Sequence, residues 1–396
     1  MKRNRCKNVI AGILVICLAI LYYLPRVYVK ASNSENRILV SLGDSYSSGE
    51  GIEPFYGQDQ KFGKRVKDEN WLAHRSKNSW ASLLTLPGNP GAMSEGWETY
   101  WFFRASSGAE TIHLNNEQPK DYGNIIISGT AYLKPQLTIF NELPMGSVDY
   151  VTITIGGNDV GFAEIIKDCA AQGIPFVNKN RLKDRFDATW REFNKDGGTA
   201  DKIMGAYKDI KEKAGAQAKI IVAGYPPLLS KDKLSKNGTG AFFSEAEVEV
   251  VNKNVKDFNE EIESIVTDCQ KESTNIYFVS VENAFKGHEA YSDEPYISGI
   301  LLTQDQDLTK NPISSYSMHP NLEGAKAYAA CVQAEIDRIE KLHSVENKIR
   351  DKIDNAANEI KEDIKEQLQF QIDWNAIWKS FLEWAERSLH ELIEGQ

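Results

Sequence analysis

A serine that directly follows a short apolar run is the first candidate for chemistry in this chain. Residues 38–42 read ILVSL, and Gly43, Asp44 and Ser45 follow. The apolar and mostly branched residues predict a buried strand, and the glycine predicts the turn at which that strand ends. A hydroxyl in such a turn lies among backbone amides that can stabilise an oxyanion, so Ser45 is the candidate nucleophile.

A serine hydroxyl needs a base and further oxyanion donors, and three later segments offer them. His319 begins the sequence HPN, Asn158 lies in IGGND, and Gly108 lies in SSGA. An imidazole can accept the hydroxyl proton, and an amide side chain donates hydrogen bonds without titrating. A glycine lets its own N–H approach a ligand closely, because it has no Cβ.

The elements that must position these residues alternate between strands and helices. The predicted strands cover residues 38–42, 100–105, 148–155, 218–223 and 276–281, and the predicted helices cover residues 80–86, 133–140, 181–213, 244–266 and 322–342. This alternation predicts an α/β fold in which helices cover both faces of a parallel sheet. Ligands of such folds bind at the carboxyl ends of the strands, so Ser45, Gly108, Asn158 and the His319 loop are expected to converge there.

Composition limits the function classes that are open to the chain. Its 396 residues, 41% of them hydrophobic, suffice for one large α/β domain with appendages. The formal net charge of -10 gives no indication of nucleic-acid binding. No cysteine or histidine cluster has metal-ligand spacing, and no cofactor is expected. Cys169, Cys269 and Cys331 in the body of the chain allow at most one intramolecular disulfide and leave one thiol free.

The first 31 residues have the pattern of an export segment. Lys2, Arg3, Arg5 and Lys7 precede an apolar stretch at residues 9–24 that carries no charge. This pattern predicts a cleaved signal peptide or a retained N-terminal membrane anchor. Either outcome places the rest of the chain outside the cell or on the outer face of the membrane.

Residues 343–396 form a separate region with the pattern of a long amphipathic helix. The region contains no proline, and its apolar residues recur every three or four positions. Its charged face is rich in acidic residues, which is unfavourable for anionic lipid head groups. We expect this tail to pack on its own enzyme or on a second copy of the chain, with attachment to a membrane or another partner as the alternative.

Four sequence blocks occur in an order and at a spacing that resemble the SGNH (GDSL-type) hydrolase superfamily. The blocks are GDSYSSGEG at 43–51, SSGA at 106–109, IGGND at 155–159 and HPN at 319–321. The resemblance covers residues 36–342, and the segments HRS at 74–76, GYP at 224–226 and GHE at 287–289 are similar to those of the secreted bacterial esterase and lipase branch. It implies a three-layer flavodoxin-like fold and an ester hydrolase that needs no cofactor.

The resemblance also implies a role for each candidate residue. Ser45 would be the nucleophile and His319 the general base, while the Ser45 amide, the Gly108 amide and the Asn158 side chain would form the oxyanion hole. Many members carry aspartate three residues before the catalytic histidine, but this chain has Tyr316 there. We therefore predict a Ser–His dyad whose imidazole is oriented by a backbone carbonyl or by Ser317.

The expected activity is hydrolysis of a carboxylic ester, of a small molecule or a lipid, through an acyl-serine intermediate. Two alternatives remain open. One is a carbohydrate O-acetylesterase, and the other is a vestigial hydrolase domain that serves as an interaction protein through its C-terminal helix. The acyl and alcohol specificity is expected to depend on the loops around the site.

Overall fold

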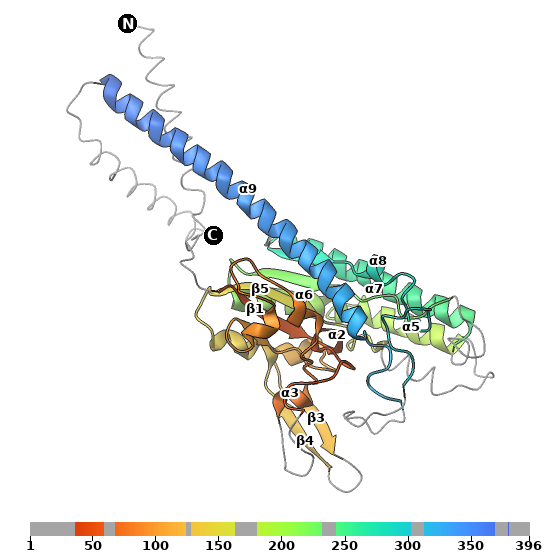
Figure 1. Ribbon diagram of the computed structural model, residues 1–396. Helices are drawn as coiled ribbons and strands as arrows, with labels where there is room; N and C mark the ends of the chain where they lie inside the picture. The colour runs from red at the N-terminus through yellow and green to blue at the C-terminus, as the bar shows by residue number, and fades with distance from the viewer. Residues whose placement is uncertain are drawn as a thin grey trace. The chain divides into compact units, whose positions relative to one another are not determined.

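A five-stranded parallel sheet forms the centre of the computed structural model, which describes residues 36–58, 68–123, 128–162, 180–231, 243–273, 275–301, 313–368 and 379 (Figure 1). Its strands are β1 (Ile38–Gly43), β2 (Trp101–Phe103), β5 (Val148–Thr154), β6 (Lys219–Ala223) and β7 (Ile276–Val279). They lie in the order β2-β1-β5-β6-β7, and each neighbouring pair is parallel. Numbered along the chain, this is the 2-1-3-4-5 order of the flavodoxin-like fold, so the predicted fold class is confirmed.

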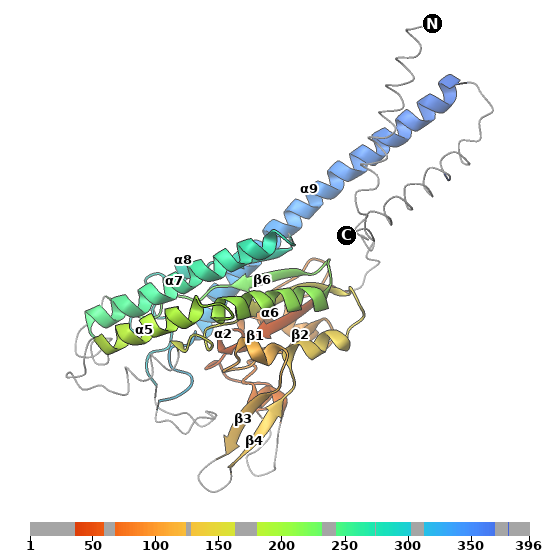
Figure 2. The same ribbon diagram turned by 180° about the vertical axis from the view of Figure 1, so that it is seen from behind.

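Helices cover both faces of the sheet, as the alternating pattern predicted. The α-helices are α2 (Ser45–Ser48), α3 (Glu69–Leu72), α5 (Asn180–Phe193), α6 (Thr199–Ala214), α7 (Glu245–Gln270), α8 (Glu282–Phe285) and α9 (Leu322–Leu368). Figures 1 and 2 show α5, α6 and α7 on one face and the first turns of α9 on the other. The strands between them are almost fully buried, so the core lies on both sides of the sheet.

Several predicted elements take a different form. The segments at 80–86 and 133–140 were predicted as helices and contain short 3-10 turns instead, η1 (Trp80–Leu83) and η4 (Gln136–Asn141), and two further turns are η2 (Met93–Gly96) and η3 (Thr111–Leu114). The predicted helix at 181–213 is divided into α5 and α6, because a turn containing Gly197 and Gly198 separates them. An antiparallel hairpin of β3 (Gln118–Gly123) and β4 (Ser128–Leu133) was not predicted.

The helix predicted at 322–342 and the helical tail predicted from residue 343 are one continuous element. α9 runs without interruption from Leu322 to Leu368. The chain divides into two compact units, and the boundary within α9 lies between Arg338 and Ile339. The predicted tail beyond residue 368, apart from residue 379, and the predicted export segment lie outside the described residues. Within the described part of the chain, no helix is long and apolar enough to span a membrane.

Candidate active site

The turn after β1 depends on a glycine. Gly43 has φ +119°, and a Cβ on this residue would lie 2.2 Å from the carbonyl oxygen of Thr154 on β5. The side chain of Gln136 also binds Gly43, accepting from its N–H at 2.7 Å and donating to its carbonyl at 2.8 Å. Only glycine therefore lets the ends of β1 and β5 approach this closely.

Ser45 begins the single-turn helix α2, directly after that turn. Asp44 is the N-cap, and its side chain accepts a hydrogen bond from the Tyr46 N–H at 3.0 Å. The turn ends at Gly49, which adopts the left-handed conformation with φ +81°. This short, tightly capped turn holds Ser45 at the carboxyl edge of the sheet, between β1 and β5, where the strand order reverses.

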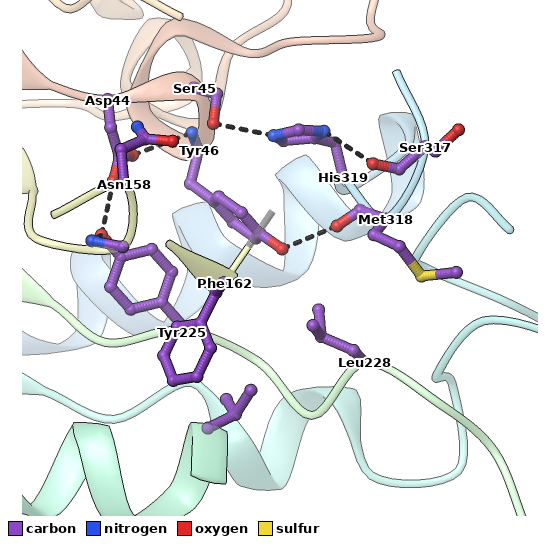
Figure 3. A pocket seen from close by; sticks show the side chains of 12 residues that line it. Asp44, Ser45, Tyr46, Asn158, Phe162, Tyr225, Leu228, Ser317, Met318 and His319 are labelled. Atoms are coloured by element: carbon purple, nitrogen blue, oxygen red, sulfur yellow. Dashed lines mark hydrogen bonds between the residues drawn. The ribbon is translucent and has the colours of Figure 1, made fainter. Parts of the chain in front are cut away.

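His319 lies within hydrogen-bond distance of Ser45. The Ser45 hydroxyl and His319 Nε2 are 2.7 Å apart, and these two residues are only 8% and 7% exposed (Figure 3). His319 Nδ1 lies 3.0 Å from the carbonyl oxygen of Ser317. A carbonyl only accepts, so Nδ1 carries the proton and Nε2 is the acceptor for the serine hydroxyl. Of the two predicted ways to orient the imidazole, the structure contains the backbone carbonyl.

Tyr46 connects the nucleophile turn to the histidine loop. Its hydroxyl donates to the carbonyl of Met318 at 2.6 Å, and its ring centroid lies 5.0 Å from that of His319 (Figure 3). Met318 adopts φ +62°, a left-handed conformation that is uncommon for a non-glycine residue. The Tyr46 hydroxyl thus fixes the strained residue between Ser317, which orients the imidazole, and His319 itself.

Asn158 and Gly108 belong to two loops that are joined next to the nucleophile turn. Asn158 Nδ2 donates to the carbonyl of Ala109 at 2.8 Å, and Asn158 lines the same pocket as Ser45 and His319. Gly108 precedes Ala109 and has φ +70°, so glycine suits its backbone conformation. The structure therefore brings the asparagine to the Ser–His pair and holds the Gly108 loop beside the asparagine.

A buried hydrogen-bond network ties the Asn158 loop to the Ser45 turn, and sequence reasoning did not find it. Asp44 accepts from the hydroxyls of Thr154, at 2.6 Å, and Tyr225, and the Tyr225 hydroxyl accepts from the Gly157 N–H at 3.1 Å. Burial of the carboxylate raises the pKa of Asp44 to about 6, although these hydrogen bonds oppose the shift. The segment GYP at 224–226 had marked the region of Tyr225 but not its connection to Asp44.

A second unpredicted feature is a buried ion pair behind the nucleophile turn. Both carboxylate oxygens of Glu50 lie 2.9 Å from His74 Nδ1, and the Ser315 hydroxyl donates to Glu50 at 2.6 Å. Burial opposes the charge of Glu50, but the charge and hydrogen bond of His74 hold the pKa of this carboxylate well below its usual range. Glu50 therefore links the GDSYSSGEG block to the HRS segment and to the loop that leads to His319.

Apolar side chains line one side of the pocket at Ser45 (Figure 3). They are Phe162, Leu228 and Met318, together with the rings of Tyr46 and Tyr225, and the apolar Val255 also lines the pocket. The polar atoms lie on the other side, with Ser45, Asn158 and His319. Such a division suits a ligand with one apolar arm and one reactive polar group.

Other predicted features can be placed as well. Asp159 accepts hydrogen bonds from the N–H and the hydroxyl of Thr111, so it stabilises a loop beside the site. Cys269 and Cys331 are free thiols, and Cys169 lies outside the described residues. In the part of the chain that the structure describes, no group of histidine, cysteine and acidic residues could hold a metal ion.

Comparison with known proteins agrees with this fold and this arrangement of residues. A family model described as GDSL-like Lipase/Acylhydrolase matches residues 39–332. A lipase of Streptomyces rimosus is 28% identical over 319 residues, which cover 80% of this chain and 94% of that lipase. Lipase 1 of Streptomyces coelicolor is 26% identical over 262 residues, which cover 66% of this chain and 75% of that protein.

Two solved structures share the fold. Phospholipase A1 from Streptomyces albidoflavus NA297 superposes with a TM-score of 0.53 at 21% identity. The extracellular lipase from Streptomyces rimosus superposes with a TM-score of 0.52 at 23% identity. Each comparison covers 76% of this chain and 99% of the other chain.

The fold and the site thus define a carboxylic ester hydrolase of the α/β class. The chain belongs to the GDSL-like lipase/acylhydrolase family, since the family model matches most of its length.

Proposed function

We propose that Ser45 attacks the ester carbonyl while His319 accepts the hydroxyl proton at Nε2. The contact of 2.7 Å between these groups is the observation that carries the proposal. The attack forms a tetrahedral oxyanion, which accepts hydrogen bonds from the Ser45 and Gly108 amides and from the Asn158 side chain. His319 then protonates the leaving alcohol, and water hydrolyses the acyl-serine by the same steps in reverse order.

The Ser317 carbonyl orients the His319 imidazole, a role that an aspartate has in a Ser–His–Asp triad. It binds the Nδ1 proton at 3.0 Å, keeps Nε2 free of a proton in the resting state, and stabilises the imidazolium through its dipole. The dipole of a carbonyl stabilises the imidazolium less than the full charge of a carboxylate does. The attack by Ser45 therefore depends more strongly on the donors of the oxyanion hole.

The preferred substrate in this proposal is an ester with an apolar acyl chain. Phe162, Leu228, Val255 and Met318 offer a surface on which a chain longer than acetyl gains free energy, about 0.8 kcal/mol for each buried CH₂. A carbohydrate O-acetylesterase would have no use for this surface. Activity on p-nitrophenyl esters from acetate to palmitate should therefore rise beyond the acetate ester.

We further propose that the enzyme works outside the cell, as a secreted protein or attached to the membrane by its first 31 residues. The basic and apolar pattern of these residues supports export. The name of the similar Streptomyces rimosus protein, an extracellular lipase, agrees with this location. The proposal assigns catalysis to residues 36–342 and association, with a second copy or another partner, to the tail at 343–396.

Covalent labelling and three substitutions test the catalytic proposal. A fluorophosphonate should label Ser45, and Ser45→Ala or His319→Ala should abolish ester hydrolysis while the fold is retained. Asn158→Ala should lower kcat about 10²–10³-fold if this side chain binds the oxyanion. Asp159→Asn is the control for changes in the same loop, and it should have a far smaller effect. Hydrolysis that survives Ser45→Ala would refute the proposed nucleophile.

A further inference from the structure

Helix α9 carries two apolar stripes on different faces. In its first turns Ala325, Tyr328, Val332 and Ile336 are fully buried. Beyond residue 340, a second stripe is exposed to between 39% and 53% and consists of Leu342, Val345, Ile349, Ile353 and Ile360. With 3.6 residues per turn, the second stripe is rotated by roughly 100° about the helix axis relative to the first. The exposed stripe is therefore a surface distinct from the buried stripe of the first turns.

The spacing of the exposed stripe is that of a coiled coil with an 11-residue repeat. Leu342 and Ile353 are eleven residues apart, and so are Ile349 and Ile360. An 11-residue repeat corresponds to 3.67 residues per turn, close to the natural pitch of the helix, so the stripe stays on one face. A continuous stripe of large exposed aliphatic side chains on a long helix indicates a missing partner helix.

The charges along this part of α9 indicate which helix the partner is. Residues 341–352 contain four basic and two acidic side chains, whereas residues 353–366 contain two basic and five acidic ones. One flank of the stripe shows the same reversal, since Lys348 and Lys352 are followed eleven residues later by Glu359 and Asp363. Such a helix is complementary to itself only when the second copy runs in the opposite direction.

We propose that the stripe on α9 is the interface with a second copy of this chain, in an antiparallel two-helix coiled coil. With Ile353 opposite Ile360 of the second copy, large exposed aliphatic side chains of the two stripes face each other at the centre of the interface. In the same register, Lys348 and Lys352 lie beside the acidic flank of the second copy. A parallel pair would bring the two basic halves together, and the two acidic halves as well.

The charge pattern also argues against a lipid surface as the occupant. A helix that lies on an anionic membrane carries lysine and arginine along both sides of its apolar face. Here the second half is strongly acidic, so half of the stripe would be repelled by such a surface. An antiparallel second copy places an acidic half beside the basic half of the helix and a basic half beside its acidic half.

Light scattering on the full chain in mild detergent tests the proposal, because the mass of the protein can be separated from that of the micelle. The wild type should be a dimer. The variant K348E/K352E and the variant E359K/D363K should each dissociate at least tenfold more readily at low salt, because like charges then face each other. An equimolar mixture of the two variants should form a dimer again.

A matched control and a cross-link complete the test. N347E/N358E adds negative charge on the face opposite the stripe and should leave the dimer intact. A zero-length carbodiimide cross-link between Lys348 and Glu366 should join isotopically different copies, because these residues are about 27 Å apart within one helix. A monomeric wild type, a dimer that survives both charge reversals, or cross-links confined to single copies would overturn the proposal. Binding of a monomeric wild type to phosphatidylglycerol vesicles would assign the stripe to a membrane instead.

Discussion

Asp44 provides a quantitative test of the physics of the site, because it is a carboxylate buried beside the nucleophile. Burial raises its pKa from 3.8 to about 6 in the folded protein. The folded state therefore holds the Asp44 proton more tightly than the unfolded state does. Its contribution to stability is consequently largest below pH 4, and it is lost as the pH rises from about 4 to about 6.

The size of this effect follows from the shift. Each pKa unit is worth about 1.36 kcal/mol, so the ionised carboxylate lowers the free energy of unfolding by about 3 kcal/mol above pH 6. Asp44→Asn removes the charge and keeps an oxygen that can accept from Tyr46 and Thr154. The amide changes the hydrogen bond with Tyr225, but this change does not depend on pH. The free energy of unfolding of the variant minus that of the wild type should therefore rise by about 2.4 kcal/mol between pH 4 and pH 7.

Urea unfolding at a series of pH values, followed by tryptophan fluorescence, measures this difference. Asp187→Asn is the control, because it removes the same charge from an exposed position on α5, where Asp187 pairs with Lys183. Its difference from the wild type should stay within about 0.5 kcal/mol over the same range. A flat or falling curve for Asp44→Asn would refute the reasoning that burial dominates at Asp44.

Three further substitutions test the supports of the site. Gly43→Ala should lower the free energy of unfolding by at least about 3 kcal/mol in urea, because its Cβ would overlap a β5 carbonyl oxygen at 2.2 Å. Tyr225→Phe should cost about 1–3 kcal/mol of stability and also lower kcat on a short ester, because it leaves the Gly157 N–H without its acceptor. Glu50→Gln should lower the free energy of unfolding at pH 7, because it weakens the hydrogen bond to His74. The difference in free energy of unfolding between wild type and variant should narrow as the pH falls below about 4, because protonation of Glu50 then removes the charge that stabilises the folded wild type. An unchanged difference at low pH would contradict the role assigned to the ion pair.

The sequence was sufficient to predict the parallel sheet, and the structure places two of the candidate residues, Ser45 and His319, side by side at its edge. Runs of branched or aromatic residues identified the five strands of the sheet, and the small residues after β1 and β5 marked the edge at which the site lies. The 3-10 turns at 80–83 and 136–141 were predicted as helices, because short apolar runs fit either form.

Contacts between distant segments account for the features that were missed. Glu50 and His74 are ordinary polar residues in the sequence, and only the fold places them 2.9 Å apart in the core. The link from Asp44 to Gly157 likewise requires Tyr225, which comes from a third strand end. The residue pattern within one segment cannot predict such pairs, because they are stabilised by burial and by partners from other elements.

The residue at position 316 shows how the histidine can act without a carboxylate. The buried Tyr316 ring packs against Phe55 and His74, and an aspartate here would add a charge next to the Glu50–His74 pair. The chain turns instead at Met318, so that the Ser317 carbonyl reaches Nδ1. A carbonyl and a carboxylate both accept without donating, so each enforces the tautomer that leaves Nε2 ready to accept the serine proton. The carbonyl lacks the full negative charge of a carboxylate, so the proposed mechanism predicts that ester hydrolysis depends more heavily on the oxyanion donors.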